Sequence, residues 1–284
     1  MRGEGYPLGV IASALGFHRS SYYKWVGAKS EEGARRSDRI DEALARRIRA
    51  ILDTHETFGY RRVWAFLRFK DGIVVNIKKV HRIMQRKGWQ CRLWHHPRRT
   101  GPRTTDRRSA VEVPDQLWST DLTKIYAGAD GWCSLIAVID NGSREVLGFR
   151  FSRRGRALEA ADALDQAVLG RYGTELPVPA GLRLRSDNGS IFLARHYLSC
   201  TNGWGIEQEY TPGYSPEWNG VIERFFRTLK QECVWLHEFS SFEEAEAVIT
   251  RWIHAYNHER LHSALGYQTP AAWRERFYAL PQAA

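Results

Sequence analysis

The back two-thirds of the chain alternates strand-like and helix-like patterns of apolar residues. Three apolar runs of strand length cover residues 117–126, 132–141 and 145–151, and Asp140-Asn141-Gly142 between the last two is typical of a hairpin turn. The pattern then predicts a helix over 157–173, a strand over 182–187, a helix over 190–200, a strand over 205–210 and a long helix over 215–235. This order predicts an α/β fold with a mixed five-stranded sheet flanked by helices.

The front of the chain is helical by the same criterion. Ile40, Leu44, Ile48 and Ile51 recur at helical spacing within residues 38–54. Two more amphipathic helices are predicted over 59–72 and 75–89, the second with Asn76 as its N-cap and Gly88 at its end. The front therefore forms small all-α regions ahead of the sheet.

Residues 8–25 read as two short helices around Gly16, and Leu15, Tyr22 and Trp25 are expected in a small core between them. This is a helix-turn-helix pattern, for which an ordinary helical hairpin is the alternative. A Pro/Arg/Thr-rich stretch after the front helices has no apolar period and reads as a linker. The predicted organisation is a helix-turn-helix segment (1–30), a helical DNA-binding domain (31–94), a basic linker (95–114), a catalytic core with the element order of the ribonuclease H-like fold (115–240), and a C-terminal helical extension (241–284).

Charge separates the two parts. The net charge is +10, but residues 1–110 hold 25 Lys/Arg against 10 Asp/Glu (+15), which leaves 17 against 22 (−5) for the rest. Such an asymmetry indicates a polyanion partner at the front, with a merely solubilising basic surface as the alternative. The front residues expected to contact DNA are Arg19, Lys24, Arg61, Arg62, Lys78, Lys79, Arg82, Arg98 and Arg99.

Other classes of protein are disfavoured. No apolar run approaches the length of a membrane span, and the first residues do not resemble a secretory signal. The four cysteines lie far apart without a CxxC pair, which argues against a zinc site or a disulfide framework. A reducing, cytoplasmic setting fits this usage.

Three acids carry the candidate chemistry. Asp121 lies in the first predicted strand, Asp187 ends the fourth, and Glu223 lies in the last helix of the sheet unit, with 223 − 187 − 1 = 35 residues between the last two. In the predicted fold the first and fourth strands are neighbours, so the two aspartates are expected at one end of the sheet, with the helix bringing Glu223 alongside. Crowded carboxylates repel one another unless a cation is present. Two Mg²⁺ or Mn²⁺ ions per site fit this ligand set and phosphodiester chemistry.

Residues around these acids are candidates for holding DNA. Arg227 and Lys230 fall on the helical face of Glu223, where the alternative is a surface ion pair. Asn188 suits either a phosphate contact or the shape of its turn. Trp218 suits either stacking on a base or covering the core.

A family resemblance supports this interpretation. The segments "WSTDLT", "SDNGS", "SPEWNGVIERFFRTLKQE" and "YNHERLHSALGYQTPAAW" resemble those of the insertion-sequence transposases of family three, in particular their second-frame product, and through the shared core they are similar to retroviral integrases. The resemblance covers nearly the whole chain. It implies that Asp121, Asp187 and Glu223 are catalytic, that Lys230 is the basic residue of the pattern, and that the chain cleaves and joins DNA strands.

The resemblance also implies partners. These are the terminal inverted repeats of an element and target DNA, bound by a homodimer or higher oligomer, and an upstream-frame product to which the active form is fused or by which it is assisted. Two other functions compete with this one. A DNA-binding regulator on an inactive core would bind DNA without cutting it, and a simple nuclease would cut without joining, although it would need neither the long basic front nor the tail.

Overall fold

A computed structural model gives the fold and describes residues 8–28, 40–91, 111, 113–174, 177–212 and 216–279. The chain divides near Arg92 into two units, which are described separately. None of the helices in these ranges is long and apolar enough to cross a membrane.

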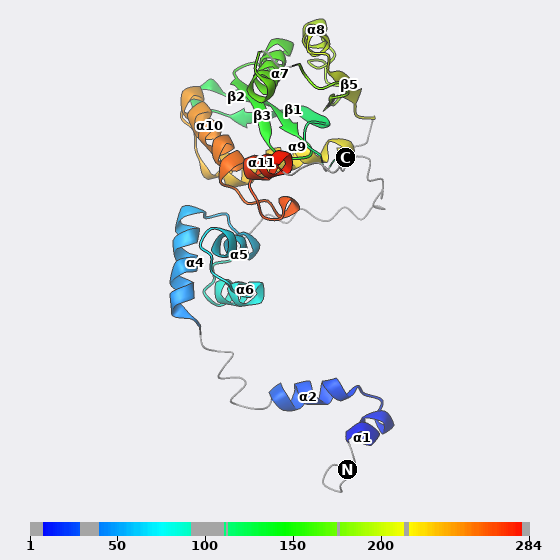
Figure 1. Cartoon of the computed structure of the whole chain (residues 1–284). Helices are drawn as coiled ribbons and strands as arrows, with labels where there is room; N and C mark the ends of the chain where they lie inside the picture. Colours follow the sequence, from blue (N-terminus) through cyan, green and yellow to red (C-terminus); the bar gives the residue numbers. More distant parts are fainter. Residues whose placement is uncertain are drawn as a thin grey trace. The chain divides into compact units, whose positions relative to one another are not determined.

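The front unit is helical, as its apolar spacing predicts (Figure 1). Its helices are α1 (Leu8–Ala14), α2 (Arg19–Ala28), α4 (Glu42–Thr54), α5 (Tyr60–Phe69) and α6 (Ile77–Arg86). Buried Ile48, Val63 and Met84 come one from each of the last three and share a core. Asn76 caps α6 by accepting the Lys78 N–H at 2.8 Å, and Gly88 follows its end with φ +69°. The predicted cap and stop are confirmed.

The first two helices differ in one respect from the expectation. Ile11 and Ala12 are buried, whereas Leu15, predicted to lie in a small core, is exposed. Leu15 follows the last residue of α1, in the turn where Gly16 has φ +66°.

The back unit contains a five-stranded sheet in the order β3-β2-β1-β4-β5. The strands are β1 (Leu117–Tyr126), β2 (Trp132–Asp140), β3 (Val146–Ser152), β4 (Arg183–Ser186) and β5 (Glu207–Tyr210). The first three are antiparallel neighbours, while β4 runs parallel to both β1 and β5. The predicted α/β fold, its mixed sheet and the pairing of the first and fourth strands are confirmed.

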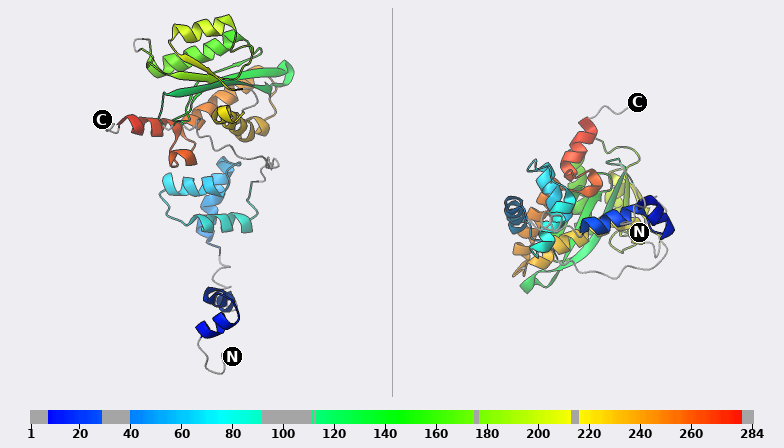
Figure 2. Two further views of the ribbon diagram at one scale, coloured as in Figure 1. Left: turned by 90° about the vertical axis from the view of Figure 1, so that its right-hand side faces the viewer. Right: turned by 90° about the horizontal axis from the view of Figure 1, so that it is seen from below.

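Helices cover both faces of this sheet (Figure 2, left). One face packs on α7 (Ala157–Tyr172) and α8 (Arg195–Gly203), around Trp118 and Leu184 of the sheet. The other packs on α9 (Gly220–Glu232) and α10 (Phe242–His258), around Ile125. The remaining elements are the short 3-10 helices η2 (Gly128–Asp130), η3 (Pro216–Asn219), η4 (Val234–Leu236) and η5 (Ser263–Leu265), and the terminal helix α11 (Pro270–Ala279).

Two predicted helices differ most from the structure in their boundaries. The helix expected over 190–200 begins only at Arg195, because Ile191 and Phe192 turn the chain and bury Phe192 before the helix starts. The long helix expected over 215–235 is α9 alone, with η3 before it and η4 after it. The linker predicted over 95–114 lies mainly outside the described residues.

Candidate active site

The alternation of side chains along β1 determines the sheet face on which Asp121 lies. Trp118 belongs to the core under α7 and α8, whereas Ile125 belongs to the core under α9 and α10. Side chains alternate between the faces of a strand, so Asp121 shares the face of Ile125 and points toward the layer that contains α9. The side chain is half-buried there. The Leu122 N–H donates to its Oδ1 at 2.7 Å.

Asp187 follows directly after β4, on the strand next to β1. Ser119 pairs with Arg185 in the parallel register, and the same offset two residues further sets Asp121 beside Asp187. Leu184 lies under α7 and α8. Side chains alternate between the faces of a strand, so Asp187, three residues later, belongs to the opposite face. The Gly189 N–H donates to Asp187 Oδ1 at 2.9 Å, which holds the carboxylate at the strand end.

Glu223 is brought over this face by α9. Ile222, Phe225 and Leu229 are buried against the sheet, which fixes the rotation of the helix and leaves Glu223 exposed in its first turn. The acids predicted to converge therefore come from β1, the end of β4, and the helix that covers their shared face.

The electrostatics of Asp121 reflects this arrangement. Burial is the largest effect and raises the pKa of Asp121, and the negative charges of Asp187 and Glu223 raise it further, to about 6. The Leu122 N–H and the Lys230 ammonium act in the opposite direction. The ionised form of Asp121 is thus disfavoured, and the positive charge of Lys230 offsets only part of this effect.

The donor set fits a hard divalent cation, because three carboxylates share one sheet face and no sulfur or imidazole is among them. The acids are not already spaced as a ligand shell, since within the described ranges no group of three or more His, Cys, Asp or Glu side chains is positioned to hold a metal ion. The chemistry of the residues therefore fits Mg²⁺ or Mn²⁺ better than a softer metal.

The neighbours of Asp187 shape the loop that carries it. The Asn188 amide donates to the Thr211 carbonyl at 3.0 Å, which fastens the loop to the end of β5. A Cβ on Gly189 would lie 2.8 Å from Asp187 Oδ1, so only glycine leaves that carboxylate its position. This bond gives Asn188 a part in shaping the turn, and its contact with a phosphate stays a prediction.

Asp140 and the C-terminal residues have structural partners. Asp140 is buried and accepts the Ser143 N–H at 2.8 Å and hydroxyl at 2.6 Å, so it caps its turn. Asn257 bonds both the N–H and the carbonyl of Val146 on β3. Arg260 donates two bonds of 2.9 Å to Glu232 at the end of α9. These residues brace the sheet and the helix of Glu223.

Comparisons with known proteins agree with this geometry. Family models of the integrase core domain match residues 112–216 and 204–270, and a model of an HTH-like domain matches residues 39–98. The 31 kDa protein of insertion element IS600 from Shigella sonnei is 30% identical over 95% of this chain and 99% of its own length. The chain belongs to the insertion-element transposases.

Other relatives support the same membership. The putative transposase InsK of insertion element IS150 from Escherichia coli K12 is 29% identical over 96% of this chain and 95% of its own length. Among solved structures, the intasome of simian T-cell lymphotropic virus in complex with a PP2A regulatory subunit matches with a TM-score of 0.51 and 18% identity, over 83% of this chain and 78% of that one. This structural likeness shows the shared fold.

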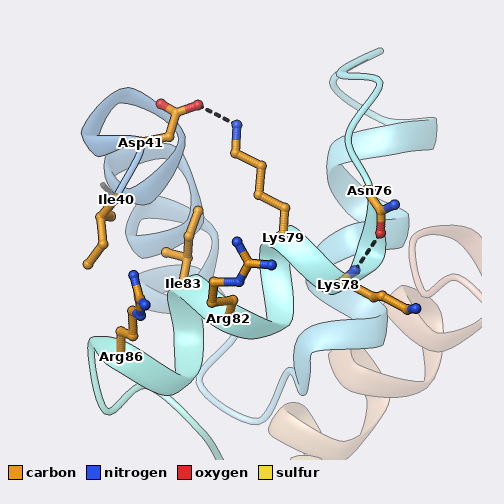
Figure 3. A pocket seen from close by; sticks show the side chains of 8 residues that line it. All are labelled: Ile40, Asp41, Asn76, Lys78, Lys79, Arg82, Ile83 and Arg86. Atoms are coloured by element: carbon orange, nitrogen blue, oxygen red, sulfur yellow. Dashed lines mark hydrogen bonds and ion pairs between the residues drawn. The ribbon is translucent and has the colours of Figure 1, made fainter. Parts of the chain in front are cut away.

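The basic residues predicted to contact DNA lie mostly on the transposase's front helices. A pocket of about 530 Å³ lies between α6 and the start of α4, and Arg82 and Arg86 line it together with Lys78. Figure 3 shows Lys79 reaching across to Asp41, at 2.8 Å. Four basic side chains line the pocket, together with the carboxylate of Asp41, so its wall is cationic.

The remaining basic candidates have varied surroundings. On α5, Arg61 is exposed and bonds the Tyr60 hydroxyl at 3.2 Å, and Arg62 lies over the Phe58 ring. Lys24 on α2 is exposed, and so is Arg227 on α9. Arg98 and Arg99 lie outside the described residues, as does the side chain of Arg19 at the start of α2.

Sequence reasoning overlooked one residue of the site, Arg185. It lies on β4 two residues before Asp187 and is only 1% exposed. The segment "LRLRS" contained the signal, since an arginine whose side chain is buried within a strand requires a partner. That partner is Glu209, which stands opposite Arg185 on β5.

Proposed function

We propose that this chain catalyses DNA strand cleavage at the ends of its insertion element and transfers the cut strands to new DNA. Asp121, Asp187 and Glu223 are the catalytic acids. The observation that carries the proposal is the common sheet face of the three acids, together with the pKa of Asp121 that the other two help to raise.

The acids are proposed to hold two Mg²⁺ or Mn²⁺ ions when DNA is bound. When bound, such a pair activates the attacking oxygen and stabilises the leaving oxygen of an in-line displacement. The mutual repulsion of the acids, which is unfavourable in the free protein, becomes a means of binding cations. Within the described residues the acids do not already form a ligand shell, so their convergence on binding DNA and cations is part of the proposal.

The reaction itself is a pair of phosphoryl transfers. In the first, water attacks a phosphodiester at the element's end, a new P–O bond forms, and the bond to the 3′ oxygen breaks and releases a 3′-OH. In the second, that 3′-OH attacks a phosphodiester of the acceptor strand, again with one P–O bond formed and one broken. The chain's own contribution is to hold both strands in line.

Basic residues are proposed to position the DNA. Lys230 and Arg227 contact phosphates next to the cut, Trp218 stacks near it, and Asn188 shapes the loop of Asp187. The front helices hold the terminal repeat through phosphate contacts, which orient the duplex without reading its sequence. Lys78, Arg82 and Arg86 at the α6 pocket supply the most concentrated set of such contacts.

The proposed partners follow from the reaction. Two ends of the element must be cut and joined together, which calls for a dimer or higher oligomer on DNA bearing the terminal inverted repeats, followed by target DNA. Fusion to an upstream-frame product would add a further means of binding DNA. The proposed setting is the cytoplasm, at the nucleoid.

The experiment compares the full chain with Asp187→Asn on labelled duplexes that carry candidate ends of the element, with Mg²⁺ and with EDTA. The wild type is expected to nick and join strands only with Mg²⁺, and the variant to bind the duplex with the same affinity without cutting it. Cleavage by a folded Asp187→Asn variant at the wild-type rate would refute the proposal. Binding by both proteins with no cleavage by either would favour a regulator.

A further inference from the structure

Arg185 is a buried cation next to the candidate active site. It lies in β4 with 1% of its surface exposed. By the alternation of side chains along the strand, it belongs to the sheet face of Asp187 and not to that of Leu184. An arginine in this setting requires several strong partners, because its charge remains when it is buried. Its contacts therefore show what it is used for.

The guanidinium of Arg185 joins two neighbouring elements. On one side its Nε and Nη2 donate to Glu209 Oε1 on β5, at 3.0 and 2.7 Å. On the other, its Nη1 donates to the Trp218 carbonyl at 2.7 Å. The guanidinium also lies over the Trp218 ring, 5.2 Å from its centroid. These contacts restrain both the position and the plane of the guanidinium.

Trp218 lies in η3, the turn that leads directly into α9. Trp218, whose carbonyl accepts the bond, lies five residues before Glu223, and Arg185 lies two residues before Asp187. One rigid group therefore connects the strand end that carries one acid to the helix start that carries another.

We infer that Arg185 is a positioning residue, which sets the separation between Asp187 and Glu223 by tying the start of α9 to β4. This inference rests on the proposed function. Arg185 touches neither the substrate nor a cation in this role. Its effect is on where the two carboxylates stand when cations and DNA arrive.

A role in stability alone is the competing explanation. Buried ion pairs often contribute little to stability compared with apolar residues of the same size, so the presence of one is weak evidence for that role. The planar fork of an arginine, in contrast, fixes geometry on two sides at once, which a lysine ammonium does not do.

The chain offers a matched control on the same strand. Arg183 is exposed and bonds the same carboxylate group, through Glu209 Oε2 at 3.1 Å. Arg183→Met therefore removes a β4 arginine and a Glu209 bond in the same way as Arg185→Met, but it leaves the Trp218 carbonyl bonded. In Arg185→Met, Arg183 still pairs with Glu209.

The experiment uses the full chain and a labelled duplex with one end of the element. It measures four quantities for Arg185→Lys, Arg185→Met and Arg183→Met: the single-turnover cleavage rate, the Mg²⁺ concentration for half the maximal rate, the duplex Kd in EDTA, and the urea midpoint. Hydrogen exchange at the backbone amides of residues 219–224 reports directly on the start of α9.

The cleavage rates of both Arg185 variants are expected to fall about 10- to 100-fold, because a displacement of the catalytic groups by about 1 Å can lower a rate by that factor. Their half-saturating Mg²⁺ concentration should rise, exchange at the start of α9 should become faster, and the Kd should stay within twofold. Arg183→Met should match the wild type. A loss of rate that simply follows the fraction unfolded would point to stability alone and overturn the inference.

Other outcomes separate the two proposals. If Arg185→Lys cleaves at the wild-type rate while Asp187→Asn is inactive, the inference about Arg185 falls and the proposed function stands. If Arg183→Met loses as much activity as Arg185→Met, the effect belongs to Glu209 or to surface charge, and the bond to Trp218 is not its cause. If the wild type does not cleave with Mg²⁺, the proposed function itself fails, whereas faster exchange in Arg185→Lys would still show that Arg185 holds the start of α9.

Discussion

Replacing Asp121 with asparagine is expected to stabilise the metal-free protein at pH 8. In the folded chain the pKa of Asp121 rises from 3.8 to about 6, mainly through burial and then through the charges of Asp187 and Glu223. Asparagine has nearly the same shape, retains an oxygen that accepts the Leu122 N–H, and carries no charge. The substitution therefore removes the unfavourable ionisation without leaving a cavity.

The magnitude follows from the shift. One pKa unit corresponds to about 1.4 kcal/mol, so a shift of about two units makes the ionised side chain unfavourable by at most ~3 kcal/mol. The ionised Asp121 lowers the free energy of unfolding, because its pKa is higher in the folded than in the unfolded chain. This destabilisation is absent below the unfolded pKa of 3.8 and grows as pH rises through the folded pKa of about 6. The advantage of Asp121→Asn should be about half as large at pH 5 as at pH 8.

Urea unfolding of both proteins in EDTA, at pH 5 and pH 8, measures this difference. In a calorimeter the same gain corresponds to roughly 2–4 °C per kcal/mol for a domain of this size. Asp162, an exposed acid on α7, provides the control, because Asp162→Asn should change the free energy of unfolding by less than ~0.5 kcal/mol. Added Mg²⁺ should stabilise the wild type more than Asp121→Asn.

A variant as stable as the wild type at pH 8, or less stable, would refute the reasoning. So would an advantage that is equal at the two pH values, since only a titrating group gives a pH-dependent gain. Either result would mean that Asp121 is better solvated, or further from Asp187 and Glu223, than the structure indicates.

Two further predictions concern the loop of Asp187 and the front helices. Gly189→Ala should lower the Mg²⁺-dependent cleavage rate by about 10- to 100-fold without changing the duplex Kd, because the new Cβ displaces the Asp187 carboxylate. The control Gly203→Ala, with nothing within 4 Å of its added Cβ, should cleave normally. Equal rates for the two alanine variants would contradict the first. Arg82→Ala combined with Arg86→Ala should weaken duplex binding and reduce the slope of log Kd against log salt by about 1 per lost phosphate contact. Titrations at several salt concentrations measure this slope, and an unchanged slope would place the DNA elsewhere.

The sheet was predictable because its strands follow simple patterns. β1 matches the expected range at both ends, and the turn after β2 carries the Asp-Asn-Gly signal that Asp140 now caps. The pairing of β1 with β4 followed from the order of the elements. These features are local in sequence or follow from a small number of allowed connections.

The helix starts near the site were less predictable. Residues 190–194 have helical composition, but Phe192 is buried against the core under α7 and α8, so tertiary contact delays α8 until Arg195. Asn188 and Trp218 each had two interpretations, and their contacts in the fold, with Thr211 and Arg185, are to residues distant in sequence. Such partners become visible only when the fold brings them together.

The helix of Glu223 is held at both ends by guanidinium groups from different parts of the chain. Arg185 of β4 bonds the turn before its start, and Arg260, which follows α10, bonds Glu232 at its end. Asn257 ties α10 itself to Val146 in the sheet. The C-terminal segment is therefore part of the frame that holds α9 over the sheet. If Glu223 is catalytic as proposed, changes in this segment should alter cleavage through the position of Glu223 even where no DNA is touched.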